Sequence, residues 1–261
     1  MRVDLLGIPF DGGSSYLRGS ALAPKAIRDS LWPEWGNSYC EVGLDLKERL
    51  HVLGDLELDI GRELESIEEK IFDSLHLKSK LIMLGGDHSI TYPILRAYKR
   101  SGCSFDVLQI DAHPDLYDSF QGTRYSHASP FARIMEESLA SSLTQVGIRT
   151  LNLHQREQSL RYGVRTIEMM EWSPMTEIHF KNPVYVSIDL DALDPAFAPG
   201  VSHPEPGGFT VREVISIIQK INVPIVGADV VELNPTVDTS NATALVAAKI
   251  VKELAGAMLS K

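Results

Sequence analysis

The stretch Val107-Leu108-Gln109-Ile110-Asp111-Ala112-His113-Pro114-Asp115 joins a short, mostly apolar run to two carboxylates and an imidazole. The run lacks the regular polar alternation of a half-exposed strand and is typical of a strand buried on both faces. Four more runs of this kind lie at Val3–Ile8, Leu81–Leu84, Val184–Ile188 and Pro224–Val231. The sequence therefore predicts a sheet with both faces covered.

Stretches with helical character alternate with these strands. One helix start carries the capping-box pattern, with Thr210 at the cap and Glu213 three residues later. The expected helices are Glu63–Leu77, Thr91–Arg100, Pro130–Leu139, Val211–Ile221 and Ala242–Leu259. This alternation predicts an α/β fold: three layers, with a doubly wound, mostly parallel sheet and helices on both faces. No linker or repeat divides the chain, so we expect one domain over residues 1–261.

Charge and cysteine usage limit the partners and the compartment. The chain has 25 Lys+Arg and 35 Asp+Glu, and its net charge of −10 disfavours nucleic acid as a partner and favours a small cationic ligand. Its two cysteines form no C-x-x-C motif, which indicates a reducing compartment. The first ten residues do not resemble a signal peptide, and no apolar run reaches the ~18 residues of a membrane span. We therefore expect a cytoplasmic protein with no membrane association.

Four of the predicted strands are followed at once by histidines or carboxylates. In doubly wound sheets the ligand crevice lies beyond the carboxyl ends of the strands. The residues placed there, strand by strand, are His88; Asp111, His113 and Asp115; Asp189 and Asp191; and Glu232. We expect them to share one rim of the sheet.

Six of these side chains form a candidate ligand set for two metal ions: His88, Asp111, His113, Asp115, Asp189 and Asp191. If the backbone stays extended, alternate side chains of the Asp-x-His-x-Asp segment point the same way and converge. Four carboxylates would neutralise two divalent cations. Oxygen-rich ligation with two imidazoles and no thiolate suits Mn²⁺ better than Zn²⁺.

Each cluster also has a simpler interpretation. The Asp-x-His-x-Asp segment could be a turn with an Asx hydrogen bond, residues 85–87 a plain turn, and residues 189–195 a solvated loop. Together, however, they would bring several like charges to buried strand ends, which is costly unless cations lie between them. Their joint occurrence favours the metal centre.

These strings resemble the ureohydrolase family, which includes arginases, agmatinases and formiminoglutamases. The matching motifs are Gly85-Gly86-Asp87-His88-Ser89, Asp111-Ala112-His113-Pro114-Asp115, Ser187-Ile188-Asp189-Leu190-Asp191-Ala192-Leu193-Asp194-Pro195, Pro204-Glu205-Pro206-Gly207-Gly208 and Ala228-Asp229-Val230-Val231-Glu232-Leu233-Asn234-Pro235. The likeness covers nearly the whole chain in the family's motif order. Within the family, residues 116–133 and 198–204 look most like plant-type, agmatinase-like arginases. The resemblance implies two Mn²⁺ ions, a guanidino substrate and a homotrimer or homohexamer.

The resemblance also implies a division of the ligands. One Mn²⁺ would be held by His88 and Asp115 and the other by His113 and Asp191. The carboxylates that bridge both ions would be those of Asp111 and Asp189.

Further residues receive catalytic roles from the same resemblance. His127 matches the family's proton-shuttle histidine, and Glu232 matches its guanidinium-binding glutamate. Asp191 would accept a hydrogen bond while water adds to the guanidinium carbon. The stretch Gly12-Gly13-Ser14-Ser15 lacks the ending of a phosphate loop, and a similar segment borders the active-site mouth in the family.

The implied reaction is the hydrolysis of L-arginine to L-ornithine and urea, with agmatine to putrescine and urea as the alternative. Val201-Ser202-His203 departs from the family's common string at this point, which makes His203 a candidate substrate contact. In the loop before His127, Arg124 would hold the α-carboxylate of arginine and Asp118 its α-ammonium, unless both are solvated loop charges.

Two other functions make different demands on the sequence. A deacetylase-like amidohydrolase would use one zinc ion and fewer carboxylates, which the six-residue ligand set argues against. An inactive scaffold of the same fold would lack a ligand or the shuttle histidine, and the sequence has all of them.

Overall fold

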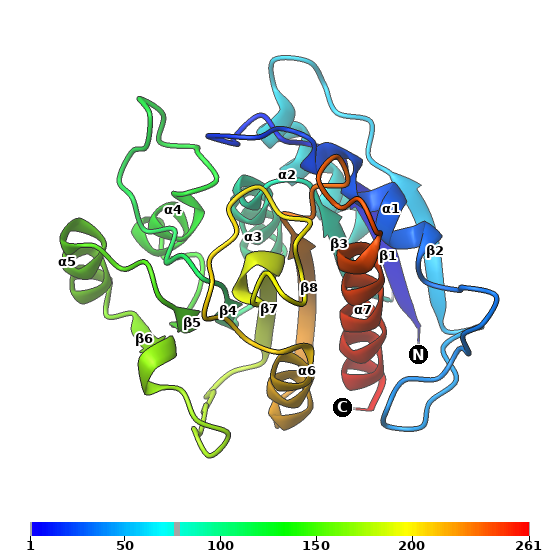
Figure 1. The fold of residues 1–261 in the computed structure, drawn as a ribbon. Coiled ribbons are helices and arrows are strands. Elements are labelled where there is room, and N and C mark those ends of the chain that lie inside the picture. Colours follow the sequence, from blue (N-terminus) through cyan, green and yellow to red (C-terminus); the bar gives the residue numbers. More distant parts are fainter. Residues whose placement is uncertain (1, 76–78, 261) are drawn as a thin grey trace.

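A single parallel sheet forms the centre of the computed structural model, which describes residues 2–75 and 79–260 (Figure 1). The strand order is β2-β1-β3-β8-β7-β4-β5-β6, and neighbouring strands pair in parallel. The strands are β1 (Val3–Ile8), β2 (Leu50–Asp55), β3 (Lys80–Gly85), β4 (Asp106–Ile110), β5 (Leu143–Ile148), β6 (Arg165–Glu168), β7 (Val184–Asp189) and β8 (Ile225–Val231). The predicted doubly wound sheet is confirmed.

Helices cover both faces of the sheet (Figure 1). They are α1 (Ala23–Asp29), α2 (Glu63–Ser74), α3 (Thr91–Arg100), α4 (Pro130–Glu136), α5 (Leu153–Tyr162), α6 (Val211–Lys220) and α7 (Ala242–Ser260). α1 and α6 pack beside α7 on one face, and α3 packs between α2 and α4 on the other. The predicted end of α2 at Leu77 lies outside the described residues. Within residues 2–75 and 79–260, no helix has the length and apolarity needed to span a bilayer.

The core consists of two apolar layers, one on each face of the sheet. Along β3, Ile82 and Leu84 belong to one layer, whereas Leu81 and Met83 belong to the other. All four side chains are fully buried, and burying each contributes about 1.5–3 kcal/mol. Since both faces of the strand are covered, its sequence shows no polar alternation.

Three strands and two helices are additional to the predicted elements: β2, β5, β6, α1 and α5. β5 carries polar side chains although it is buried. The amide nitrogen of Gln145 donates to Gln109 Oε1 at 2.7 Å and to the Pro114 carbonyl at 2.6 Å. Hydrogen bonds of this kind satisfy polar groups inside the sheet, so β5 lacks the apolar run by which the other strands were found. The capping box at the start of α6 is confirmed.

The sheet order places the predicted rim in the middle of the molecule. β3, β8, β7 and β4 are consecutive neighbours at the centre of the sheet. Because all four strands are parallel, their carboxyl ends lie side by side. The residues that follow them along the chain therefore meet in space.

Candidate metal centre

The structure brings all six predicted ligands together at this rim. One group of potential ligand atoms comes from His88, Asp111 and Asp115, and a second comes from Asp111, His113 and Asp191. Within each group the atoms lie within 4.8 Å of one another. Asp111 belongs to both groups. Asp189 is in neither, but its Oδ2 lies 3.2 Å from His88 Nδ1.

Asp115 and Asp191 reach the rim through turns, and not through the extended backbone expected from the sequence. Asp115 adopts a left-handed conformation with φ of 51°, which costs a non-glycine residue about 1–3 kcal/mol. Asp191 lies in the 3-10 turn η4 (Leu190–Ala192), where its backbone N–H donates to Asp189 Oδ1 at 2.8 Å. The convergence was predicted, but alternation along an extended strand is not its cause.

A hydrogen-bonded chain fixes the orientation of His88. The residue begins the 3-10 turn η2 (His88–Ile90), which Gly86 and Asp87 separate from the end of β3. Its Nε2 is 2.9 Å from Ser187 Oγ, and that hydroxyl donates to Asp229 Oδ1 at 2.6 Å. Because the Ser187 hydrogen is used on Asp229, Nε2 of His88 carries the ring proton. The lone pair of Nδ1 is then free to act as a ligand.

The surroundings of His88 Nδ1 test whether a cation fits this site. The atom is buried and makes no hydrogen bond of normal geometry, yet oxygens of Asp111, Asp115 and Asp189 surround it at 3.0–3.2 Å. Burial, reinforced by Asp191, raises the pKa of the Asp111 carboxyl to about 7. The same two causes raise the pKa of Asp189 well above its usual range. Buried carboxylates and a free imidazole nitrogen are the donors that a divalent cation satisfies, so the residues fit a metal centre.

His113 and Asp191 form the other side of the centre. Nδ1 of His113 lies 2.9 Å from Asp191 Oδ2. Burial lowers the pKa of His113, but the Asp191 carboxylate outweighs it and raises that pKa to about 11. Burial raises the pKa of Asp191, but His113 outweighs it and leaves that pKa below its usual range. The two side chains hold each other where both face Asp111.

Beside the carboxylates, His127 and Glu232 form a second functional pair. Nδ1 of His127 is 2.9 Å from Glu232 Oε1, and its Nε2 is 2.8 Å from Ser15 Oγ. Glu232 follows β8 in a left-handed conformation with φ of 66°. Burial lowers the pKa of His127, but Glu232 outweighs it and raises the pKa to about 9. The direction of this pKa shift favours the protonated, charged form of His127.

Residues of the candidate metal centre and the His127–Glu232 pair line one cavity of about 200 Å³. Its lining residues are Ser15, His113, Asp115, Tyr117, Phe120, His127, Ala128, Thr150, Gln155, Asp189, Asp191, His203 and Glu232. His203 lies in the wall, with its ring centroid 5.0 Å from that of His127. The cavity combines a cluster of acids with a proton donor, an arrangement suited to a cationic substrate.

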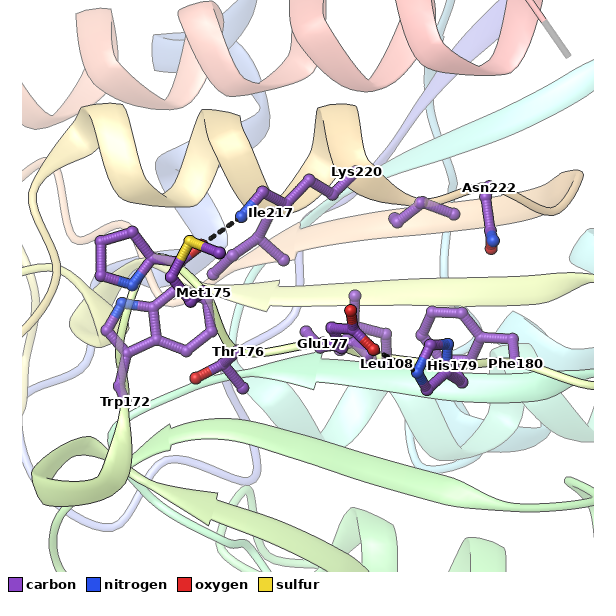
Figure 2. Close-up of a pocket in the computed structure, with 13 residues that line it drawn as sticks. Leu108, Trp172, Met175, Thr176, Glu177, His179, Phe180, Ile217, Lys220 and Asn222 are labelled. Carbon is purple, nitrogen blue, oxygen red and sulfur yellow. Dashed lines mark hydrogen bonds and ion pairs between the residues drawn. The ribbon is translucent and has the colours of Figure 1, made fainter.

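A larger cavity of about 440 Å³ lies elsewhere, between α6 and the segment that contains Trp172 and Phe180 (Figure 2). Its titratable groups are already paired. Lys220 Nζ donates to the Pro174 carbonyl, and His179 pairs with Glu177. None of the predicted site residues lines it, so cavity size does not identify the site here.

Comparison with known proteins agrees with this centre. Residues 1–256 match the model of the arginase family. The chain belongs to the arginase family. It is 47% identical to arginase 1, mitochondrial, of Arabidopsis thaliana, over 98% of this chain and 81% of that protein. It is 45% identical to the same plant's arginase 2, chloroplastic/mitochondrial, over 97% and 80%. The solved arginase from Medicago truncatula superposes with a TM-score of 0.94 at 44% identity, covering 98% of this chain and 87% of that one.

Membership in the arginase family confirms three predictions: the ureohydrolase family itself, enzymatic hydrolysis of a guanidino C–N bond, and a cofactor of two Mn²⁺ ions. The predicted cytoplasmic location is contradicted, because the two plant relatives are named for mitochondria and chloroplasts. That prediction depended on the cysteine usage, on a start unlike a signal peptide and on the lack of a long apolar run. None of these features distinguishes the cytoplasm from other reducing compartments.

Arg124 and Asp118 do not line the 200 Å³ cavity beside the candidate metal centre. The Arg124 guanidinium donates to Asp118 Oδ1 at 3.1 Å and to Glu136 Oε2 at 2.6 Å. Asp118 also accepts a hydrogen bond from the buried Arg133 at 3.2 Å. The two predicted substrate contacts are therefore engaged in a half-exposed ion-pair network, in place of the expected contact with a substrate.

Several cavity residues were not singled out from the sequence. Thr150 and Gln155 follow β5, and Tyr117 and Phe120 follow Asp115 in the chain. Recognising β5 as a strand would have placed Thr150 at the rim, because the rim collects whatever follows a parallel strand. Ser15 was anticipated through the family segment, and the structure places it against His127.

Proposed function

We propose that this protein hydrolyses L-arginine to L-ornithine and urea. The observation that carries the proposal is the pairing of two carboxylate–imidazole groups with a buried glutamate and the histidine that it contacts, all at one cavity. A guanidinium is a planar cation, and carboxylates recognise it through charge and paired hydrogen bonds. The names of the plant relatives support arginine as the substrate.

The metal ions would be held by the six residues at the rim. We assign His88 and Asp115 to one Mn²⁺, His113 and Asp191 to the other, and Asp111 and Asp189 to both. The position of Asp111 in both groups supports its bridging role. When bound, the two ions supply the positive charge that makes a water molecule acidic enough to ionise near neutral pH.

The remaining chemistry falls to residues of the chain. Glu232 orients the guanidinium, and Asp191 accepts a hydrogen bond as water adds to the guanidinium carbon. The bond from that carbon to the side-chain nitrogen then breaks, and His127 protonates the departing nitrogen. Urea and the amine product leave the site. Ser15, at Nε2 of His127, keeps the ring in place between proton transfers.

One observation favours agmatine as a second candidate. Among the residues described around the cavity, none is Lys or Arg, so no fixed cation faces the position of an α-carboxylate. Agmatine carries no such group.

The cavity wall also contains polar residues that belong neither to the candidate ligands nor to the His127–Glu232 pair. They are Ser15, Tyr117, Thr150, Gln155 and His203. We propose His203 as a substrate contact there.

A urea-release assay of the Mn²⁺-loaded protein tests the proposal. Arginine, agmatine, guanidinobutyrate and guanidine are compared in parallel at equal concentrations. The highest kcat/KM for arginine is the expected result. A higher value for agmatine would replace arginase activity with agmatinase activity, and urea release from none of the four would overturn the proposed function.

We propose a trimer or hexamer of single-domain subunits spanning residues 1–261. The family resemblance supports both. Light scattering reports the mass of the assembly, and a monomer would contradict the first part. Limited proteolysis that gives two stable fragments would contradict the second.

A further inference from the structure

Arg149 connects the loops on which the second metal group is built. It follows β5, and its Nη2 donates to the carbonyl oxygens of Asp191 at 2.7 Å and Glu205 at 2.6 Å. Nη1 lies 3.2 Å from the carbonyl of Gly147 and 3.3 Å from that of Ala192. Four backbone carbonyls therefore share one guanidinium.

The backbone of Arg149 reaches the other ligand loop. Its N–H donates to the Ala112 carbonyl at 3.0 Å, and Ala112 lies between Asp111 and His113. The Ala112 N–H in turn faces Asp191 Oδ1 at 3.3 Å. One residue thus fixes both sides of the group formed by Asp111, His113 and Asp191.

The Arg149 guanidinium packs closely against Gly208, where a larger residue would not fit. A Cβ at Gly208 would lie 2.6 Å from both Arg149 Nη2 and the Ala192 carbonyl, closer than side chains approach. The fit is specific for arginine, because a planar fork can hold several carbonyls in fixed directions and a lysine ammonium is a single point.

From these contacts we propose that Arg149 is a positioning residue for the Mn²⁺ ion held by His113 and Asp191. It belongs to neither group of candidate ligands and does not line the cavity. It sets the spacing between the Asp191 turn and the Ala112 loop, and so the distance between two ligands from different strands. The inference rests on the proposed assignment of ligands to the two ions.

Titration of metal-free protein with Mn²⁺ tests this role, with the free ion followed by its paramagnetic resonance signal. We expect wild-type protein to bind two ions. Arg149→Lys retains the positive charge but loses the fork, and we expect one binding step to stay near the wild-type value while the other weakens about 10- to 100-fold. Arg165→Lys is the matched control, because Arg165, at the exposed start of β6, also donates to a carbonyl, that of Glu177 at 2.9 Å. Both steps should be unchanged in that variant.

A general structural role would weaken both steps equally and lower the unfolding temperature of the metal-free protein. That result, or two unchanged steps, overturns the proposal. If Arg149→Lys does not fold, Arg149→Gln decides by the same criteria, since its amide keeps two N–H donors but cannot reach four carbonyls at once. Wild-type protein that binds fewer than two ions would instead refute the ligand assignment of the proposed function.

Discussion

His127 Nδ1 lies 2.9 Å from the same Glu232 oxygen, Oε1, that accepts a hydrogen bond from the backbone N–H of His88 at 2.8 Å. One carboxylate oxygen thus connects the proposed proton donor, His127, to the turn that carries the proposed ligand His88. Glu232 is buried and holds a left-handed backbone conformation. The strain and the burial of charge are both compensated by this double hydrogen bonding.

Turnover should therefore depend on pH through His127. The protonated form is stabilised fully below the unfolded pKa of about 6.5, and that stabilisation is lost as pH rises through about 9. We expect kcat to rise into the alkaline range as water ionises and to fall above about pH 9. Glu232→Gln removes the charge that raises the pKa, so its decline in kcat should begin at lower pH. A pH–rate profile of both proteins measures the shift.

His127→Asn is the control for this profile. It removes the proton donor but no ligand, so kcat should fall about 100-fold or more while elemental analysis still finds two Mn²⁺ per chain. A variant that also loses metal would place His127 among the ligands and contradict its role as a proton donor.

Asp111→Asn should have opposite effects on the metal-free and the Mn²⁺-loaded protein. The raised pKa of Asp111 means that the folded state binds an extra proton between the ordinary pKa and about 7, so stability falls as pH rises through that window. At pH 8 Asp111 must be ionised while buried, which lowers the stability of the metal-free protein. Asparagine carries no charge and removes this free-energy cost. A gain of about 1 kcal/mol would raise the unfolding temperature of the metal-free protein by about 2–4 °C. The stabilisation by Mn²⁺ should be lost, because both groups lose a ligand. Scanning calorimetry with and without metal would contradict this if the asparagine lowered both unfolding temperatures equally.

Arg124→Ala should change arginine and agmatine hydrolysis equally and little. Its guanidinium is half exposed and bound to Asp118 and Glu136, outside the cavity. Exposed ion pairs contribute about 0–1 kcal/mol, so the expected loss of stability is small. Steady-state kinetics on both substrates provide the check. A selective loss with arginine would restore Arg124 as the carboxylate contact.

The gathering of the candidate ligands at one rim could be predicted because each cluster closely follows a buried strand. Leu81–Leu84 and Val184–Ile188 have no polar alternation, and the chain leaves each strand at the same edge of the sheet. Parallel pairing then brings His88 and Asp189 together without further information. In such a fold, the residues that follow each strand can be placed at one edge of the sheet from the sequence alone.

The substrate end could not be predicted in this way. Asp118 and Arg124 lie between two site residues in the chain, but their side chains point to Glu136 and Arg133 on α4. Which way a loop side chain points depends on such partners, and a sequence does not reveal them. The residues after β5, including Arg149, were missed because the buried Gln145 hides the apolar pattern of that strand.

Ser187→Ala should weaken the binding of one Mn²⁺ and spare the other. The hydroxyl accepts from His88 Nε2 and donates to Asp229, which also accepts from Tyr185 at 2.8 Å. Without it the buried ring nitrogen has no acceptor, and the ring is free to turn Nδ1 away from the carboxylates. We expect the step assigned to His88 to weaken about 10- to 100-fold. The lost hydrogen bond should also destabilise the metal-free protein by about 1–3 kcal/mol.

Ser159→Ala is the matched control, since it removes a buried hydroxyl of α5 that is hydrogen-bonded to Thr166. That variant should lose stability and keep both Mn²⁺ steps. Equal Mn²⁺ affinities in Ser187→Ala and wild type would show that the Ser187 chain does not orient His88.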